Sequence, residues 1–400
     1  MKMKLLLTTL FAVACVSVAS AQTTLRFTGS TAFRAATVTA IQNVLNSGYT
    51  YGYVGSSVNG ANQSIFVGTT KVGGLSVIIK CSFAGSVGGV QTIAQQSPVV
   101  TTASPYLSES NALTTTGAVI TAASGVFDSP ANADIAMSDS YQASTAFYGT
   151  GYNTLVDNVV GVVPFVWTKG SSKDATVQAA LDTVTNITPL QARVLLAGGM
   201  PISLLTGKSA DSSVYVYPLG RDEDSGTRLV AFAEPAFGIF ASPIQYQPTI
   251  ASGEITSIAA WPAATVLGIS YTTGHSGFSS GGTMATNLNT PVAATAVDAF
   301  KAKFALIAYF GVNDANGVNT GKNNLTYNGV AYSADAVREG AYSFWGYEHL
   351  MYRSTLAGNS KTVADQIAAQ IKNTDAAVSG VLLSTMNVSR VTEGAVITRK

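Results

Sequence analysis

Short apolar segments that each end in a polar or glycine-containing turn recur four times along this chain. The segments are 24–27, 75–79, 133–137 and 214–217, and the turns that follow them are 28–31, 85–89, 138–140 and 221–227. Helical patterns follow the first, second and fourth turns, and this alternation of strands and helices predicts an α/β fold. Because ligands of open α/β sheets bind at the carboxyl ends of strands, we expect the four turns to form a binding site.

The last of these turns predicts the kind of ligand. Arg221 precedes Ser225, Gly226 and Thr227, which open a helical run that Pro235 ends. The first turn of a helix has unpaired backbone N–H groups and about half a positive charge. A guanidinium group and two hydroxyls beside such a terminus are typical of an oxyanion site. The alternative is that Arg221 forms a surface ion pair, for example with Glu223.

The start of the chain predicts export. A basic start at residues 1–4 is followed by an apolar run over 5–18 and a small-residue cleavage pattern at 19–21. This pattern is typical of a signal peptide spanning 1–21. A lipoprotein cleavage site before Cys15 is an alternative. After cleavage at Ala21 only Cys81 remains, so no intrachain disulfide is expected.

Composition limits the classes of partner. Hydrophobic residues make up 47% of the chain, charged residues make up 11%, and the formal net charge is +1. These values allow large cores but give no long-range field that would attract nucleic acid or a membrane surface. An anion site in this chain must therefore be local.

Four motifs, taken in order, resemble those of the phosphate-binding periplasmic substrate-binding proteins of ABC transporters. The first two are Thr-Gly-Ser-Thr-Ala-Phe at 28–33 and Gly-Ser-Val-Gly-Gly at 85–89. The others are Ala-Asp-Ile-Ala-Met-Ser-Asp at 133–139 and Arg-Asp-Glu-Asp-Ser-Gly-Thr at 221–227. The chain departs from the family pattern at Val87, where a serine is usual, and at Glu223 and Asp224, where Asp-Gly is usual.

The resemblance implies a two-lobed type 2 periplasmic-binding-protein fold with the ligand cleft between the lobes. Lobe one would comprise 22–158 and 312–400, and lobe two 159–311, with the apolar runs 159–167 and 306–310 as crossovers. It further implies a periplasmic monomer that binds inorganic phosphate without a cofactor and delivers it to a membrane permease. The implied ligand-binding residues are Ser30, Thr31, Phe33, Ser86, Asp139, Arg221, Ser225, Gly226 and Thr227.

The chemistry of these residues suits phosphate. Phosphate keeps at least one proton at neutral pH, so its site needs many donors and one ionised acceptor. Asp139 would accept the P–OH proton, whereas fully ionised sulfate has no such proton and would leave that carboxylate repelled and unpaired. The donors would be the Arg221 guanidinium, the hydroxyls of Ser30, Thr31, Ser86, Ser225 and Thr227, and the backbone N–H groups of Phe33, Gly226 and Thr227.

Several of these residues could have a purely structural role instead. Ser30, Thr31 and Asp139 could be helix caps, and Glu223 and Asp224 are expected to be solvated acids at a helix start. A hydrolase is one alternative, but a hydrolase that used His275 would need a serine at a sharp turn between a strand and a helix, and no such turn is expected. Another alternative is a secreted or surface protein with this fold that binds a different oxyanion or has lost its ligand. Segments 52–68 and 97–129 are predicted to be surface insertions.

Overall fold

The computed structural model of the protein describes residues 22–95, 105–129, 131–266 and 269–400. The predicted signal peptide and Cys15 lie outside these residues. Eleven strands of the described chain form one mixed sheet. In spatial order they are β5 (Ala118–Val119), β2 (Thr50–Tyr53), β3 (Gln63–Thr69), β4 (Ser76–Ser82), β1 (Thr23–Gly29), β6 (Ile135–Ser138), β17 (Trp345–Arg353), β7 (Leu155–Lys169), β15 (Lys303–Gly311), β10 (Val214–Leu219) and β9 (Met200–Pro201).

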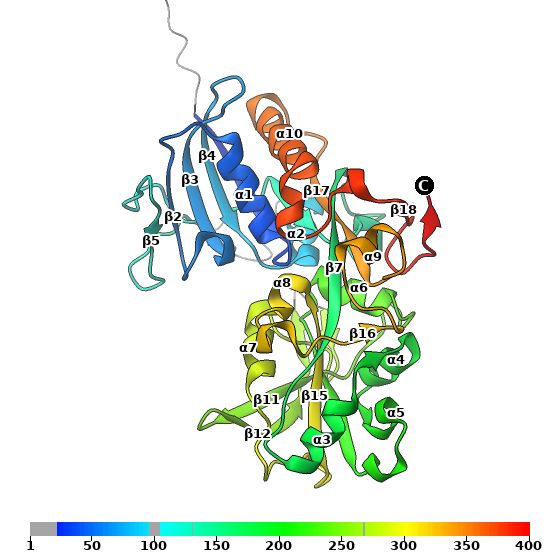
Figure 1. The fold of residues 1–400 in the computed structure, drawn as a ribbon. Coiled ribbons are helices and arrows are strands. Elements are labelled where there is room, and N and C mark those ends of the chain that lie inside the picture. Colours follow the sequence, from blue (N-terminus) through cyan, green and yellow to red (C-terminus); the bar gives the residue numbers. More distant parts are fainter. Residues whose placement is uncertain (1–21, 96–104, 130, 267–268) are drawn as a thin grey trace, which may run out of the picture.

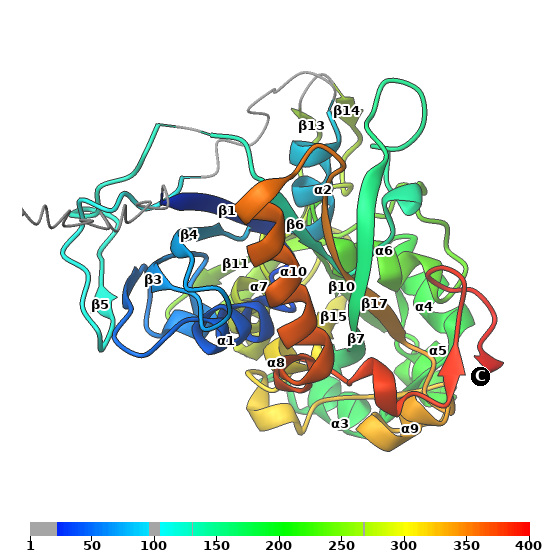
Figure 2. The same cartoon turned by 90° about the horizontal axis from the view of Figure 1, so that it is seen from above.

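Strand β7 joins the two lobes that Figure 1 shows. It is 15 residues long and pairs with β17 in the upper lobe as far as Pro164. From Phe165 onward it pairs with β15 in the lower lobe. Figure 2 shows β7 and β17 close together, and they pair along residues 155–164 of β7. One sheet therefore continues through both lobes, and β7 changes partner between two adjacent residues.

Helices cover both faces of the upper part of the sheet. The pair α1 and α10 packs together on one face (Figure 1), over a core that includes Phe27, Ile135 and Met137. Helix α2 packs on the opposite face against Ala136 and Met351, as the alternation of side chains along a strand requires. The helices are α1 (Arg34–Val44), α2 (Ser86–Ala94), α3 (Ala175–Thr183), α4 (Pro189–Leu196), α5 (Ser203–Thr206), α6 (Gly226–Ala233), α7 (Gly281–Asn289), α8 (Val312–Ala315), α9 (Ala334–Arg338) and α10 (Gly358–Asn373).

Short two-stranded ladders complete the fold. One of them sets the path of the returning chain, because β16 pairs with β8 of the middle segment before the chain reaches β17. The ladders join β8 (Asn186–Ile187) to β16 (Thr326–Tyr327), β11 (Tyr246–Ala251) to β12 (Glu254–Ala260), β13 (Ala264–Val266) to β14 (Ile269–Tyr271), and β18 (Val388–Ser389) to β19 (Thr398–Arg399).

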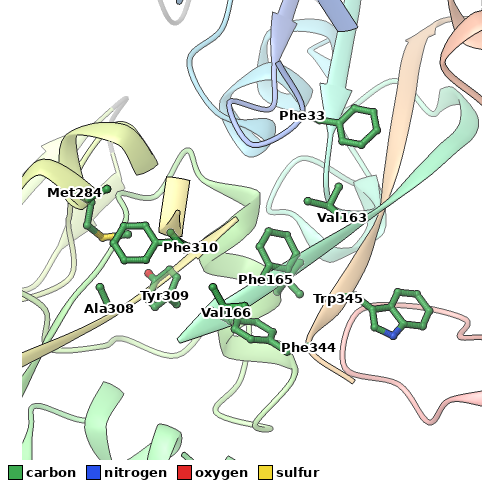
Figure 3. Close-up of a cluster of buried hydrophobic side chains, with 14 of the residues drawn as sticks. Phe33, Val163, Phe165, Val166, Met284, Ala308, Tyr309, Phe310, Phe344 and Trp345 are labelled. Atoms are coloured by element: carbon green, nitrogen blue, oxygen red, sulfur yellow. The ribbon is translucent and has the colours of Figure 1, made fainter. Parts of the chain in front are cut away.

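The main hydrophobic core follows β7 from one lobe to the other. Figure 3 shows Phe33 above β7, Val163 and Phe165 on it, and Phe310 and Met284 on the far side. All five side chains are at most 1% exposed. The lobes therefore share packed side chains at the crossover.

The prediction that segment 52–68 is a surface insertion is wrong. This segment contains part of β2 and most of β3, and β3 pairs along its whole length with β4 of the central sheet. Ile65 and Phe66 are fully buried. Strand β2 has only four residues and a glycine within it, and both features weaken its strand signal. Segment 97–129 falls partly outside the described residues, and the remainder includes the edge strand β5, with Leu107 and Ile120 packed in a small apolar cluster with Ile65.

The prediction of an α/β fold class is confirmed, and both predicted crossover runs are strands, β7 and β15. The lobe boundaries at 22–158, 159–311 and 312–400 stay a proposal. The first boundary falls inside β7. Among the described residues, no helix has both the length and the apolar character needed to cross a bilayer. Cys81 is a buried free thiol.

Candidate functional site

Backbone hydrogen bonds bring the four sequence-predicted turns together. Strand β1 lies between β4 and β6 and is parallel to both, so the carboxyl ends of the three strands meet at one edge. Ser30 N–H donates to the Met137 carbonyl at 2.8 Å, and Gly85 N–H donates to the Gly29 carbonyl at 2.9 Å. From the other lobe, the Asp224 carbonyl accepts hydrogen bonds from Val87 N–H (2.9 Å) and Gly88 N–H (3.2 Å). The first turn of α2 thus contacts the loop that precedes α6.

Asp139 lies at the centre of this contact. Its side chain is 1% exposed, and its two carboxylate oxygens accept hydrogen bonds from Ser86 Oγ at 2.6 Å and from Thr227 Oγ1 at 3.1 Å. Ser86 belongs to one lobe and Thr227 to the other. Burial raises the pKa of Asp139, while these two hydrogen bonds and the nearby Arg221 lower it. The effect of burial is the largest, so the pKa of Asp139 stays above its usual value, and the two hydroxyl donors and the guanidinium offset part of that rise.

Gly226 lets Asp139 approach the start of α6. A Cβ atom at position 226 would lie 1.7 Å from Asp139 Oδ1, which no side chain can tolerate. Ser225 is the N-cap of this helix, and its Oγ accepts a hydrogen bond from Arg228 N–H at 3.2 Å. A hydroxyl that accepts in this way still has its own proton to donate. The N-terminus of α6 therefore faces the carboxylate of the opposite lobe at close range.

Arg221 is buried and held in place by backbone carbonyls. Its Nε donates to the Phe278 carbonyl and its Nη2 to the Ser279 carbonyl, both at 2.9 Å, and its backbone N–H donates to Tyr309 Oη at 3.0 Å. Its Nη1 makes no hydrogen bond within the part of the chain that the structure describes. The guanidinium group is thus oriented by the protein and keeps one edge for a ligand.

Other side chains hold the loop that carries Arg221. Gln245 Nε2 donates to the Arg221 carbonyl at 2.9 Å, and Arg228 Nη1 donates to the same carbonyl at 2.9 Å. Tyr309 Oη in turn donates to Gln245 Oε1 at 2.7 Å. Three side chains from three different elements therefore fix one carbonyl and one N–H of a single residue.

The first turn contributes less than the sequence predicted. Phe33 is the N-cap of α1, and its N–H donates to Ser30 Oγ at 3.3 Å, so this predicted ligand donor already has a partner. The Phe33 ring is fully buried beneath Gly161. Thr31 is 8% exposed and its side chain makes no hydrogen bond to the residues that the structure describes. Ser30 and Thr31 keep hydroxyl protons that a ligand could accept.

Three charged or ionisable side chains near the site were not predicted. Arg34, the first residue of α1, directly follows the first motif, and its guanidinium donates to Asn62 Oδ1. Burial lowers the pKa of Arg34, and the Asp314 carboxylate raises it while Arg221 lowers it. Asp314 packs against the start of α7, where a Cβ at Gly281 would lie 2.0 Å from Asp314 Oδ2. Burial raises the pKa of Asp314, and Arg221 and Arg34 both lower it.

The third missed residue is Glu348 in β17. Both of its carboxyl oxygens are buried and have no hydrogen-bond partner among the described residues. The only signal in the sequence was a charged residue inside the apolar run 344–352. Arg34 could have been found from its position next to the first motif, whereas nothing local pointed to Asp314.

The prediction that Asp224 is a solvated acid is wrong. Burial, with a smaller contribution from the nearby Glu223, raises the pKa of Asp224 to about 6, although Arg221 opposes this rise. The neighbouring Asp222 has a buried Oδ1 without a partner among the described residues, and burial raises its pKa to about 7. Glu223 is half-buried and accepts a hydrogen bond from Ser276 Oγ at 3.1 Å.

A cavity of about 240 Å³ lies beside the site. Leu229, Phe240 and Tyr271 are among the residues that line it, and Ser225 and Arg228 also border it. Neither Asp139 nor Arg221 lines this cavity, and its exposed lining is mainly apolar. It is therefore a neighbour of the charged site and does not coincide with it.

The two histidines do not form an evident catalytic group. His349 is fully buried, and its Nδ1 lies 2.7 Å from Asp157. His275 stacks on Tyr271 with ring centroids 4.3 Å apart, and burial lowers its pKa to about 4. Among the described residues, no group of three or more His, Cys, Asp or Glu side chains could hold a metal ion.

Comparisons with known proteins give matches in three-dimensional structure alone. No family model matches the chain, and no curated protein matches it in sequence. Similar solved structures include an ABC-type phosphate transport receptor from Vibrio cholerae, with 11% identity, 90% of this chain and 99% of that chain covered, and a TM-score of 0.44. A phosphate ABC transporter substrate-binding protein from Clostridium perfringens gives 12% identity, the same coverages and a TM-score of 0.44. Similarity at this level does not establish what this chain binds.

Proposed function

We propose that this protein binds inorganic phosphate between its two lobes and delivers it to the membrane permease of an ABC transporter, outside the cytoplasmic membrane. One observation carries the proposal: Arg221, oriented by the protein, and Asp139, whose two carboxylate oxygens accept hydrogen bonds from Ser86 and Thr227, are buried at the same inter-lobe contact. Hydroxyl groups of Ser30, Thr31 and Ser225 and the start of α6 surround them.

The pairing of a cation with one carboxylate selects a protonated oxyanion. A phosphate oxygen accepts from Arg221 and from the α6 terminus, while the remaining P–OH donates to Asp139. Sulfate has no proton to offer, so its binding would leave a buried carboxylate against a negative ligand. Leaving a buried charged group without a partner costs about 1–3 kcal/mol or more, which favours phosphate.

Ligand binding and lobe closure are coupled in this proposal. Asp139 and Ser86 come from one lobe, and Arg221, Ser225 and Gly226 come from the other. Phosphate reaches both sets of groups only when the lobes meet, so it favours the closed state through its differential contacts. We propose no enzymatic activity and no cofactor, and we propose that the protein is a monomer.

Calorimetry on phosphate-stripped protein tests this function. We expect about one phosphate site per chain and no measurable heat with sulfate at the same concentration. A protein that shows neither heat nor a thermal shift with millimolar phosphate would be a fold relative without this ligand. Release of phosphate from a phosphate ester at a rate that follows protein concentration would favour the hydrolase alternative.

A further inference from the structure

Glu348 is a buried carboxyl group that the fold does not use. Its side chain is 0% exposed, and neither carboxyl oxygen has a hydrogen-bond partner within the described chain. Buried polar atoms almost always have partners, and an orphaned carboxyl group is destabilising. Such groups persist mainly where function requires them.

The position of Glu348 in the sheet places it on the face of the predicted binding turns. Glu348 pairs with Gly161 of β7, and a Cβ at Gly161 would lie 2.8 Å from the Phe33 ring. Two residues earlier on the same strand, a Cβ at Gly346 would lie 3.0 Å from the Asp139 carbonyl oxygen. Residues opposite each other and two apart share a face of a sheet, so Glu348 points to the side of Phe33 and Asp139.

The titratable groups nearest to Glu348 along its strand lie on the other face. His349 and Asp157 pair there at 2.7 Å, and Tyr141 contacts the rings of His349 and Tyr347. On the Glu348 face, the Asp139 carboxylate is the charged group that acts on it, and the Ser30 hydroxyl is the polar group that acts on it. Glu348 thus adjoins two residues of the candidate phosphate site.

We propose that Glu348 contacts the ligand of this site and donates its carboxyl proton to an oxygen of bound phosphate, while Asp139 accepts the proton of the P–OH. This proposal rests on the proposed phosphate function. Asp139 would then accept a hydrogen bond from the protonated oxygen of the ligand, and Glu348 would donate one to an ionised oxygen of the same ligand. No bond other than hydrogen bonds forms or breaks.

Burial and the negative charge of Asp139 raise the pKa of Glu348 well above its usual range, and the Ser30 hydroxyl lowers it. Burial and the Asp139 charge therefore favour the neutral form of Glu348, which has a proton to donate. When the pH rises through that pKa, phosphate binding requires uptake of one proton. Affinity should then fall by up to about tenfold per pH unit, the slope for one linked proton.

Two substitutions separate a donor role from a structural one. Glu348→Gln keeps an N–H donor that does not titrate, and Glu348→Leu removes the donor while filling a similar volume. Phosphate titration by calorimetry at about pH 7 should place Glu348→Gln within about threefold of wild type, and Glu348→Leu at about tenfold weaker or more. Glu254→Gln, in β12 and paired with Lys173 away from the site, is the control.

Stability and pH profiles complete the test. Glu348→Leu should be at least as stable as wild type without ligand, because it removes an orphaned buried carboxyl group. As the pH rises, the affinity of Glu348→Gln relative to wild type should rise, because the glutamine does not titrate. Wild-type affinity in Glu348→Leu, equal losses in the Gln and Leu variants, or a joint loss of stability and affinity would each overturn this proposal. Absence of phosphate binding by the wild type would instead overturn the proposed function itself.

Discussion

The loop that carries Arg221 is held by many hydrogen bonds, whereas the acidic groups that face it are held by few. Gln245, Tyr309 and Arg228 fix the backbone of Arg221, and two carbonyls fix its guanidinium group. On the other side, Asp139 depends on one hydroxyl from its own lobe and one from the opposite lobe, and Glu348 has no partner among the described residues.

This difference suggests a division of labour. The cationic half is preorganised, so it does not have to rearrange when an anion arrives. The acidic half is completed only by the ligand and by the opposite lobe. Selectivity and closure should therefore depend on the acidic half, and most of the affinity on the cationic half.

Removal of the preorganised cation should have the largest effect. Arg221→Ala should weaken phosphate binding by about 2–5 kcal/mol, because it deletes a charge-assisted contact from a desolvated site. The measurement is calorimetric titration of stripped protein. Arg193→Ala, at an exposed position of α4, is the matched control and should bind as wild type does. If Arg221→Ala binds within about threefold of wild type, Arg221 does not touch the ligand.

The second-largest effect is expected from a methyl group added where the two halves of the site touch. Gly226→Ala places a Cβ 1.7 Å from Asp139 Oδ1 and should force the lobes apart, which weakens binding by about 1–3 kcal/mol. Small-angle scattering should show that phosphate reduces the radius of gyration of the wild type but not of Gly226→Ala. Gly282→Ala, where a Cβ meets nothing closer than 3.8 Å, should close normally. Identical wild-type curves with and without bound phosphate would contradict the closure model.

The selectivity for phosphate over sulfate tests the role of the acidic half directly. Asp139→Asn replaces an acceptor by a group that can also donate, so the penalty against sulfate should shrink. We expect the ratio of phosphate affinity to sulfate affinity to fall by about tenfold or more. Titration of both anions into both proteins gives this ratio, and an unchanged value would remove Asp139 from its role as the acceptor of the P–OH proton.

The smallest effect concerns the stability of the Arg221 loop. The pKa of Asp222 is raised to about 7 in the folded state, so the folded state binds a proton that the unfolded state releases above about pH 4. Stability without ligand should therefore decline as the pH rises from about 4 to about 7. Asp222→Asn should be more stable than wild type at about pH 8 and nearly equal to it at about pH 4, with the difference growing as the pH rises between them. Urea unfolding at both pH values measures this, and equal differences at the two would show that Asp222 does not titrate in this range.

Local sequence signals were sufficient to find helices whose first residues include a cap residue, a proline or a glycine. Thr188 and Pro189 are a cap residue and a proline of the kind that starts a helix, and α4 begins there with a complete capping box between Thr188 and Gln191. Ser225 and Gly226 likewise marked the start of α6. Caps and turns are set by residues adjacent in sequence, so one sequence is enough to find them.

The missed features depend on contacts between distant residues. Strand β3 was hidden because its alternation is short, yet pairing with β4 over 76–82 makes it a central strand. Glu348 stands 318 positions from Ser30 in the chain, and only the insertion of β17 between β6 and β7 brings it near Asp139. The resemblance to phosphate-binding proteins named residues from four motifs and could not name groups outside them.

The position of β17 also has a consequence for how the chain is made. This strand fills the place between β6 and β7, and it is followed by α10, which packs on α1. As the chain emerges from its N-terminus onward, the N-terminal lobe lacks both elements until residues 345–373 are available, and β6 and β7 present open edges until then. In the middle segment, β10, β15 and the second half of β7 can already pair once residue 311 is complete. We therefore expect the middle of this protein to fold before its beginning, with the first-made lobe finished last.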